Sequence, residues 1–164
     1  MNLFFCTTAS KRLALVAFII MSSTLAGLAH AGNGDVFLTR YINGLNAAMP
    51  PSGNPGQAAD LFTTDADQIN MLAPPSAKPQ RNREAIRQFF AGFDGFFSDW
   101  THVEKSRMTH GNSAVWEGVA QGHHRESGKP LRLPIVFFLE FDNDGAVREL
   151  RVYVDERSIG DQLQ

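Results

Sequence analysis

The chain has 164 residues, 43% of them apolar, and a formal net charge of −2. Fifteen basic residues are balanced by seventeen acidic ones, and no basic cluster alternates with aromatic residues. Nucleic-acid-binding proteins usually show such a basic footprint, so this composition argues against a nucleic-acid partner.

The first 31 residues have the pattern of a secretory signal peptide. Lys11 and Arg12 precede the apolar run "LALVAFIIM" at 13–21, and small residues lead to "AHA" at 29–31. This order matches the basic region, apolar region and cleavage site of an export signal. The apolar run is shorter than the roughly 20 residues of a membrane span, although a retained N-terminal anchor is the alternative. We therefore expect a signal peptide at 1–31, a domain at 32–164, and a periplasmic or secreted protein with no membrane association after cleavage.

The domain must be held together by its apolar core. The single cysteine, Cys6, lies inside the predicted signal peptide, so no disulfide is expected even in an oxidising compartment. Removal of the signal changes the formal net charge to −4. Thirteen phenylalanines, most of them beyond residue 31, supply material for a core.

Three helices are predicted in the first part of the domain. In "DVFLTRYINGLNAAMPP" the apolar positions recur with helical spacing, with Asp35 as a candidate N-cap and Pro50 as a stop. "QAADLF" at 57–62 predicts a short second helix. "NREAIRQFFAGFDGFF" predicts the third, with Asn82 as its N-cap.

Beyond the third helix the apolar pattern changes to the two-residue period of strands. Strands are predicted at 99–109, 113–123, 131–142 and 146–155, after a short strand at 68–72, and "DNDG" at 142–145 predicts a hairpin turn. Helices followed by a strand meander predict an α+β fold, with three N-terminal helices packed on one face of a curved antiparallel sheet.

Several segments in this order resemble the NTF2-like superfamily of cone-shaped (cystatin-like) folds. They are "RYINGLNA", "ADLFTTDA", "NREAIRQFF", "SGKPLRLP", "FDNDGAVRELRVYVD" and the terminal "DQL". Together they span nearly the whole domain. The chain is most similar to the SnoaL-like polyketide cyclase branch and its ketosteroid isomerase relatives.

The ketosteroid isomerase resemblance retains one of three catalytic groups. Its tyrosine oxyanion donor corresponds to Tyr41, its carboxylate base to Asn70, and its protonated aspartate to Phe137. An amide cannot accept a proton at neutral pH and a phenyl ring cannot donate one, so we do not expect classical steroid isomerisation. Tyr41 is either a pocket donor or a core residue with one hydrogen-bond partner. Asn70 either orients a substrate oxygen or satisfies a strand end.

The SnoaL-like cyclase resemblance assigns an acid/base aspartate to Asp155, directly after the last strand. At the rim of an apolar cone, burial would raise the pKa of this carboxyl and suit it to proton transfer. The alternative is a solvated strand end paired with Arg151 or Arg157.

The histidines do not form a recognisable metal site. His123 and His124 are adjacent on a strand and point to opposite faces, and no zinc-binding spacing is present. We therefore expect no metal and no cofactor. One of this pair is a candidate helper of Asp155; we assign His123, but a bulge would invert the parity and select His124 instead. His102 and His110 are expected to be solvated.

Apolar residues are expected to line the interior of the cone and contact a small hydrophobic ligand, unless they fill it completely. The candidates are Phe62, Met71, Met108, Trp116, Ile135 and Phe137, with Asn70 as a polar contact.

Three functions fit this pattern. The first is an exported enzyme, an isomerase or cyclase of SnoaL-like type, that performs isomerisation, cyclisation or hydration on a small hydrophobic molecule. The second is a non-catalytic ligand-binding module, and the third is a protein-interaction module. Because Val136 and Phe138 alternate with Ile135 and Phe137, both sheet faces are apolar, and we expect a homodimer through the outer face.

Overall fold

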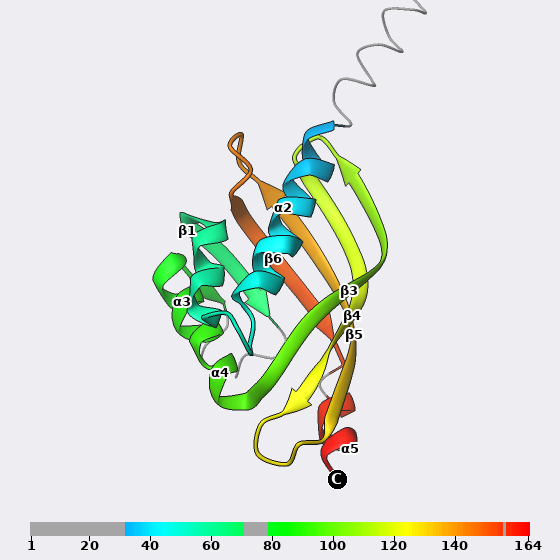
Figure 1. Ribbon diagram of the computed structural model, residues 1–164. Helices are drawn as coiled ribbons and strands as arrows, with labels where there is room; N and C mark the ends of the chain where they lie inside the picture. The colour runs from blue at the N-terminus through cyan, green and yellow to red at the C-terminus, as the bar shows by residue number, and fades with distance from the viewer. Residues whose placement is uncertain (1–31, 71–78, 156) are drawn as a thin grey trace, which may run out of the picture.

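The structure is a computed structural model that describes residues 32–70, 79–155 and 157–164 (Figure 1). The predicted signal peptide at 1–31 lies outside the described residues, as does Met71. The helical elements are α2 (Gly32–Ala48), the 3₁₀ helix η1 (Pro55–Leu61), α3 (Arg83–Ala91), α4 (Phe93–Phe96) and α5 (Arg157–Leu163). The strands are β1 (Phe62–Asn70), β2 (Gln80–Arg81), β3 (Phe97–His110), β4 (Ser113–His124), β5 (Pro130–Phe141) and β6 (Val147–Val154).

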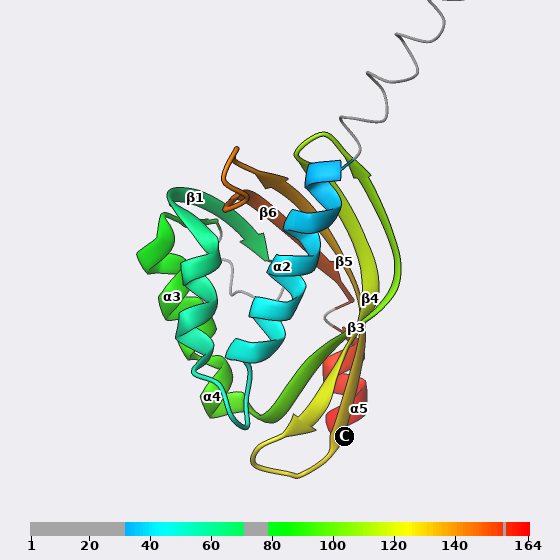
Figure 2. The same ribbon diagram turned by 45° about the horizontal axis from the view of Figure 1, so that its top comes forward.

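The described strands form one curved six-stranded sheet in the order β2-β1-β6-β5-β4-β3. Figure 2 shows α2 lying across the hollow of this sheet, with α3 next to β1 and α4 next to the start of β3. The predicted α+β fold with N-terminal helices on one face is therefore confirmed. The sheet is not wholly antiparallel, because β1 pairs with β6 in parallel register.

The helix boundaries follow local chemistry. Asn82 caps α3 as predicted, accepting a hydrogen bond from the Ala85 amide at 3.0 Å. Asp35 lies in the first turn of α2 rather than at its cap, and it accepts a hydrogen bond from Arg107 of β3 at 3.0 Å. The predicted second helix is a 3₁₀ helix that begins earlier, at Pro55, because proline fits the first helical position and Asn54 caps it.

The sheet bends where β3 is irregular and β4 carries glycine. Register shifts occur in β3 between Phe97 and Asp99 and between Glu104 and Ser106. Opposite them, a Cβ on Gly118 would collide with the Val103 carbonyl and the Trp116 ring, and one on Gly122 with the Asp99 carbonyl. Bulges and glycines of this kind bend a sheet and let neighbouring backbones approach closely. The hollow of the cone therefore depends on these positions.

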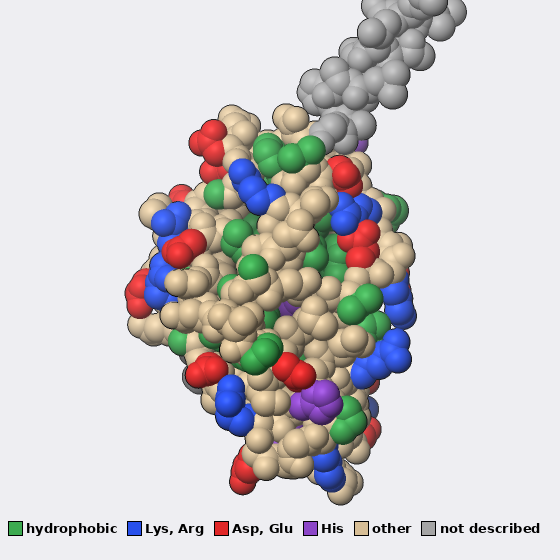
Figure 3. All heavy atoms as spheres, viewed as in Figure 1, with side chains coloured by type: hydrophobic (Ala, Val, Ile, Leu, Met, Phe, Trp, Pro, Cys, Tyr) green, Lys and Arg blue, Asp and Glu red, His purple; other side chains and the backbone are tan. Residues whose placement is uncertain are grey.

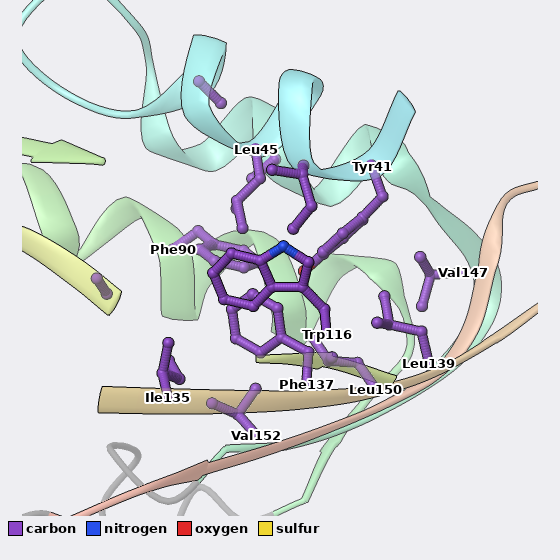
Figure 4. Close-up of a cluster of buried hydrophobic side chains, with 14 of the residues drawn as sticks. Tyr41, Leu45, Phe90, Trp116, Ile135, Phe137, Leu139, Val147, Leu150 and Val152 are labelled. Atoms are coloured by element: carbon purple, nitrogen blue, oxygen red, sulfur yellow. The ribbon is translucent and has the colours of Figure 1, made fainter. Parts of the chain in front are cut away.

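Alternate residues of the strands fill the hollow with apolar side chains (Figure 4). Trp116 is fully buried and its ring stacks on Phe137 with centroids 5.0 Å apart. The Trp116 indole N–H donates to Glu104 at 2.9 Å, so its polar atom is satisfied. The outward positions of β5 are the even-numbered ones, as the burial alternation from Pro130 to Phe141 shows.

The terminal helix α5 has no counterpart among the predicted elements. It packs against β5, and the Gln162 side chain accepts from the Arg132 amide at 2.7 Å and donates to the Arg132 carbonyl at 3.2 Å. β6 pairs with β5 only from Ile135 onward. Gln162 therefore hydrogen-bonds the Arg132 backbone groups that a longer β6 would have paired. Among the described residues, no helix is long and apolar enough to span a membrane.

Candidate functional site

The hollow between α2 and the sheet retains a small internal cavity of about 20 Å³. A buried water requires roughly 10–15 Å³ in this measure, so the cavity has room for about one water molecule. Three polar side chains contribute to its wall: Tyr41 from α2, Asn70 from the end of β1, and His102 from β3. The remaining wall is aliphatic and aromatic. It comprises Leu45, Phe90, Phe93, Trp100, Ile135, Phe137, Leu150 and Val152.

His102 is held in one tautomer by Asn46 of α2. The Asn46 amide oxygen accepts from the His102 backbone N–H at 2.8 Å, and the amide nitrogen donates to the His102 carbonyl at 3.1 Å. These bonds fix which end of the amide is oxygen, and that oxygen lies 3.0 Å from Nδ1 of the ring. Nδ1 must therefore carry the proton, which leaves Nε2 as a bare acceptor.

The expectation that His102 is solvated was wrong. Its side chain is 7% exposed, and burial lowers the pKa of the ring to about 3. The ring packs among aromatic side chains, with its centroid 5.7 Å from that of Phe137. His102 is therefore a neutral histidine at physiological pH.

Tyr41 combines the two alternatives that the sequence left open. Its ring is a core element, 2% exposed, with edge contacts to Phe62 and Phe137 at centroid distances of 6.0 and 6.2 Å. Tyr41 lines the cavity, and its buried hydroxyl has no hydrogen-bond partner among the described residues. Burial raises the pKa of Tyr41 well above its usual value, so the hydroxyl stays protonated and can donate.

Of the other expected ligand contacts, Asn70, Ile135 and Phe137 also line the cavity. Asn70 is 5% exposed, and Phe62 and Trp116 are completely buried in the adjacent core. Met108 lies elsewhere: it is 70% exposed near the far end of β3, so it does not line the interior. Its apolar character gave no information about which face it occupies.

Asp155 lies at the surface, directly after β6, and does not line the cavity. Its carboxylate accepts from the Arg157 amide at 3.1 Å, and its carbonyl accepts from the Ser158 hydroxyl at 2.6 Å. These bonds form the turn that leads into α5. No ion pair of Asp155 with Arg151 or Arg157 occurs in the described part of the chain; Arg151 instead pairs with Glu149.

Neither histidine of "GHHRE" lies beside Asp155 or the interior cavity. His123 is exposed and its Nδ1 lies 3.0 Å from both carboxylate oxygens of Asp99. The Nδ1 of His124 lies 2.9 Å from the Ser127 hydroxyl. Within the residues that the structure covers, no three His, Cys, Asp or Glu side chains gather into a metal site.

The sequence did contain a signal for His102. In "DWTHV" the residues Trp100 and His102 are two positions apart, so a strand places them on one face. Recognising Trp100 as a core residue would have assigned His102 to the core too. Nothing in the sequence could pair it with Asn46, because the two lie 56 residues apart.

Comparison with known proteins gives the same fold. The family model of the SnoaL-like domain matches residues 38–150, whereas no curated protein sequence matches the chain. Similar structures include a ketosteroid isomerase-like protein from Catenulispora acidiphila in complex with trimethylamine, at 19% identity and TM-score 0.62, over 74% of this chain and 90% of that one. Another is a SnoaL-like polyketide cyclase from Jannaschia sp. CCS1, at 15% identity and TM-score 0.66, over 81% and 92%.

A phenazine biosynthesis-related protein from Pseudomonas aeruginosa is also similar, at 14% identity and TM-score 0.64, over 83% of both chains. At these identities the similarity concerns the fold and not the activity. The family match and the shared fold agree with each other, and this protein belongs to the SnoaL-like domain family of the NTF2-like superfamily.

Proposed function

We propose that this protein binds a small, uncharged, largely apolar molecule inside the cone. The observation that carries the proposal is the unpartnered hydroxyl of Tyr41, a residue that lines the cavity together with a neutral His102. Buried polar atoms are nearly always hydrogen-bonded, so an orphaned hydroxyl beside a cavity indicates a partner that the protein itself does not supply.

The polar groups define the ligand's chemistry. Tyr41 offers a donor, Nε2 of His102 an acceptor, and Asn70 an amide. No charged side chain lines this cavity within the described part of the protein, and a charge without a counter-charge is costly to bury. A ketone, an alcohol or a small amide with an apolar body meets these requirements.

The size of the cavity restricts how such a ligand enters. Space for about one water is less than any organic molecule needs, so the aromatic wall must move when a ligand binds. Phe93 is only partly buried and belongs to the short helix α4, so its ring is the one we expect to move. One protein of the same fold was solved in complex with trimethylamine, a molecule of a few heavy atoms.

Acid/base catalysis is the second candidate. A donor and an acceptor on one cavity could serve an isomerisation, cyclisation or hydration, and a protein of the same fold is described as a polyketide cyclase. However, with a pKa of about 3 His102 is a weak base at neutral pH, whereas an effective base has a pKa near the working pH. The pKa of His102 therefore favours binding over proton abstraction.

Titration of the purified protein with cyclohexanone, followed by NMR of the histidine side chains, tests the proposal. We expect the His102 signals to shift and Tyr41→Phe to weaken binding by about two- to tenfold, the effect of one hydrogen bond. Tyr153→Phe is the matched control, because Tyr153 is 51% exposed on the outer face. Equal affinity in wild type and Tyr41→Phe would contradict the proposal.

Export is a separate proposal that rests on the sequence of residues 1–31. It predicts that mass spectrometry of the expressed protein finds an N-terminus near Gly32. An intact N-terminus in the membrane fraction would indicate a retained anchor instead.

A further inference from the structure

A second hollow, of about 410 Å³, opens at the end of the sheet where β3 begins and β4 ends. Its volume falls within the range of small-molecule sites and is far larger than that of the interior cavity. Residues after α2 and from β3, β4 and β5 line it, including Pro51, Asp99, Gln121, His123, Pro130 and Arg132. We call this hollow the Asp99–His123 groove.

Polar side chains from three neighbouring strands meet in this groove. Asp99 is opposite His123, and Gln121 is opposite Arg132, so all four share one face of the sheet. Arg132 and His123 are diagonal neighbours on adjacent strands. A long side chain reaches across such a diagonal. The groove therefore brings a carboxylate, an imidazole, an amide and a guanidinium to one place.

Asp99 contacts both the backbone and the ring of His123. One carboxylate oxygen of Asp99 accepts from the His123 backbone N–H at 2.6 Å and lies 3.0 Å from the ring Nδ1. Gly122 allows this arrangement, since any Cβ there would strike the Asp99 carbonyl. Because Nδ1 faces the carboxylate, it carries a proton, and Nε2 is the ring nitrogen left to contact a ligand.

Arg132 is the groove's cation. Its guanidinium forms no ion pair or hydrogen bond with any residue that the structure describes. Its backbone N–H and carbonyl are both hydrogen-bonded to the Gln162 side chain. A charged side chain on a fixed backbone beside an ordered histidine is suited to hold an anion.

We propose that the Asp99–His123 groove binds a small organic monocarboxylate, with Arg132 holding the carboxylate and the doubly protonated ring of His123 donating from Nε2–H to the same group while its Nδ1–H donates to Asp99. A single negative charge is favoured, because the Asp99 carboxylate in the same groove repels a dianion such as a phosphate monoester. The prolines and Leu131 in the wall provide the apolar contact for the rest of the molecule. This site is independent of the interior cavity, whose described lining residues carry no charge.

Benzoate is the probe, titrated into the purified protein and followed by NMR of the histidine side chains. We expect the His123 signals to move, those of His102 to stay, and affinity to fall as salt is added. Arg132→Gln should weaken benzoate binding about tenfold and His123→Gln severalfold. Arg148→Gln is the control, because it removes the same charge from an exposed residue outside the groove and should leave binding unchanged.

The proposal is overturned if benzoate fails to bind, if Arg148→Gln weakens it as much as Arg132→Gln, or if His102 responds in place of His123. Benzamide, which has the same ring without the charge, should not compete; equal binding of benzamide would show that the carboxylate is not what is recognised. Melting curves of each variant establish that it is folded. The interior cavity is tested separately, because cyclohexanone should shift only the His102 signals. The result at one site therefore does not decide the result at the other.

Discussion

Asn46 and His102 are joined like neighbouring strands of a sheet, although Asn46 belongs to a helix. Its amide pairs with both backbone groups of His102, at 2.8 and 3.1 Å, and with the ring nitrogen at 3.0 Å. β3 is an outermost strand of the sheet, and the free backbone groups of such strands must be covered or solvated. One side chain therefore covers the edge of the sheet and selects the tautomer of a buried histidine.

Replacing Asn46 with alanine removes all three contacts. Because the His102 amide and carbonyl are partly buried there, we expect the free energy of unfolding to fall by about 1–3 kcal/mol. Urea denaturation measures this. The control is Asn43→Ala, an exposed asparagine of the same helix, which should change stability by less than about 0.5 kcal/mol.

Stability should fall as the pH drops below about 6.5, because His102 resists protonation when folded. Above pH 6.5 the ring is neutral in both states, so it contributes no pH dependence. Between about 6.5, its ordinary pKa, and about 3, its folded pKa, only the unfolded chain binds the proton. The free energy of unfolding then decreases by at most about 1.4 kcal/mol per pH unit.

Urea denaturation of His102→Gln at pH 7, 5.5 and 4.5 tests this assignment. The variant should lose the His102 part of the slope, whereas His110→Gln, at an exposed histidine of the same strand, should retain it. Parallel pH profiles for wild type and His102→Gln would show that the ring is not the group responsible.

Substitutions at Asp155 distinguish a role in forming the turn from a role as a catalytic acid or base. In the turn that precedes α5, asparagine accepts the same backbone hydrogen bond as aspartate. We expect Asp155→Ala to lower the melting temperature, at a cost of about 0.5–1 kcal/mol, and Asp155→Asn to restore it. If Asn destabilises as much as Ala, the turn does not depend on this hydrogen bond. The catalytic role implied by the family resemblance predicts instead that, on an identified substrate, Asn lowers turnover by roughly 10²–10⁴-fold.

Gly118 should not tolerate a side chain. A Cβ at this position meets the Val103 carbonyl and the Trp116 ring, so Gly118→Ala must displace the backbone of β3 or the central tryptophan. We expect a loss of about 1–3 kcal/mol in the free energy of unfolding. Gly95→Ala is the control, since a Cβ there has no neighbour within 4 Å. Equal stability of the two variants would contradict the close approach of β3 and β4.

The outer face of the sheet should form a homodimer. Phe138 and Tyr153 are 46% and 51% exposed there, and their ring centroids lie 5.5 Å apart, so they offer an apolar surface to a second copy. Figure 3 shows the helix-bearing side of the molecule, where acidic and basic side chains are dispersed among smaller apolar groups. Light scattering should give a dimer at micromolar concentration and a monomer for Phe138→Lys. Val36→Lys, at an exposed residue of α2, should leave the dimer intact.

Local patterns in the sequence determined the long strands and the fold class, but not α5 or the full length of β1, which begins at Phe62 rather than at residue 68. The strand predicted at 113–123 is observed at Ser113–His124, because the alternation of polar and apolar residues reflects a half-buried strand directly. The Asn82 cap was predictable for the same reason: its partner is three residues away. The sequence segments within these elements carried the resemblance to the NTF2-like superfamily, and the SnoaL-like family match agrees with it.

Apart from the spacing of Trp100 and His102, which places both on one face, the tertiary structure decided what lies at the candidate sites. Periodicity shows that the two faces of a strand alternate but not which face is covered. Met108 was therefore predicted to be inside and His102 outside, whereas Met108 is exposed and His102 is buried. The bulges in β3 shift the alternation by one residue. The pairings of Asn46 with His102 and of Asp99 with His123 join residues distant in sequence. Such contacts follow from the bending of the sheet and the packing of α2 across it, which no local pattern encodes.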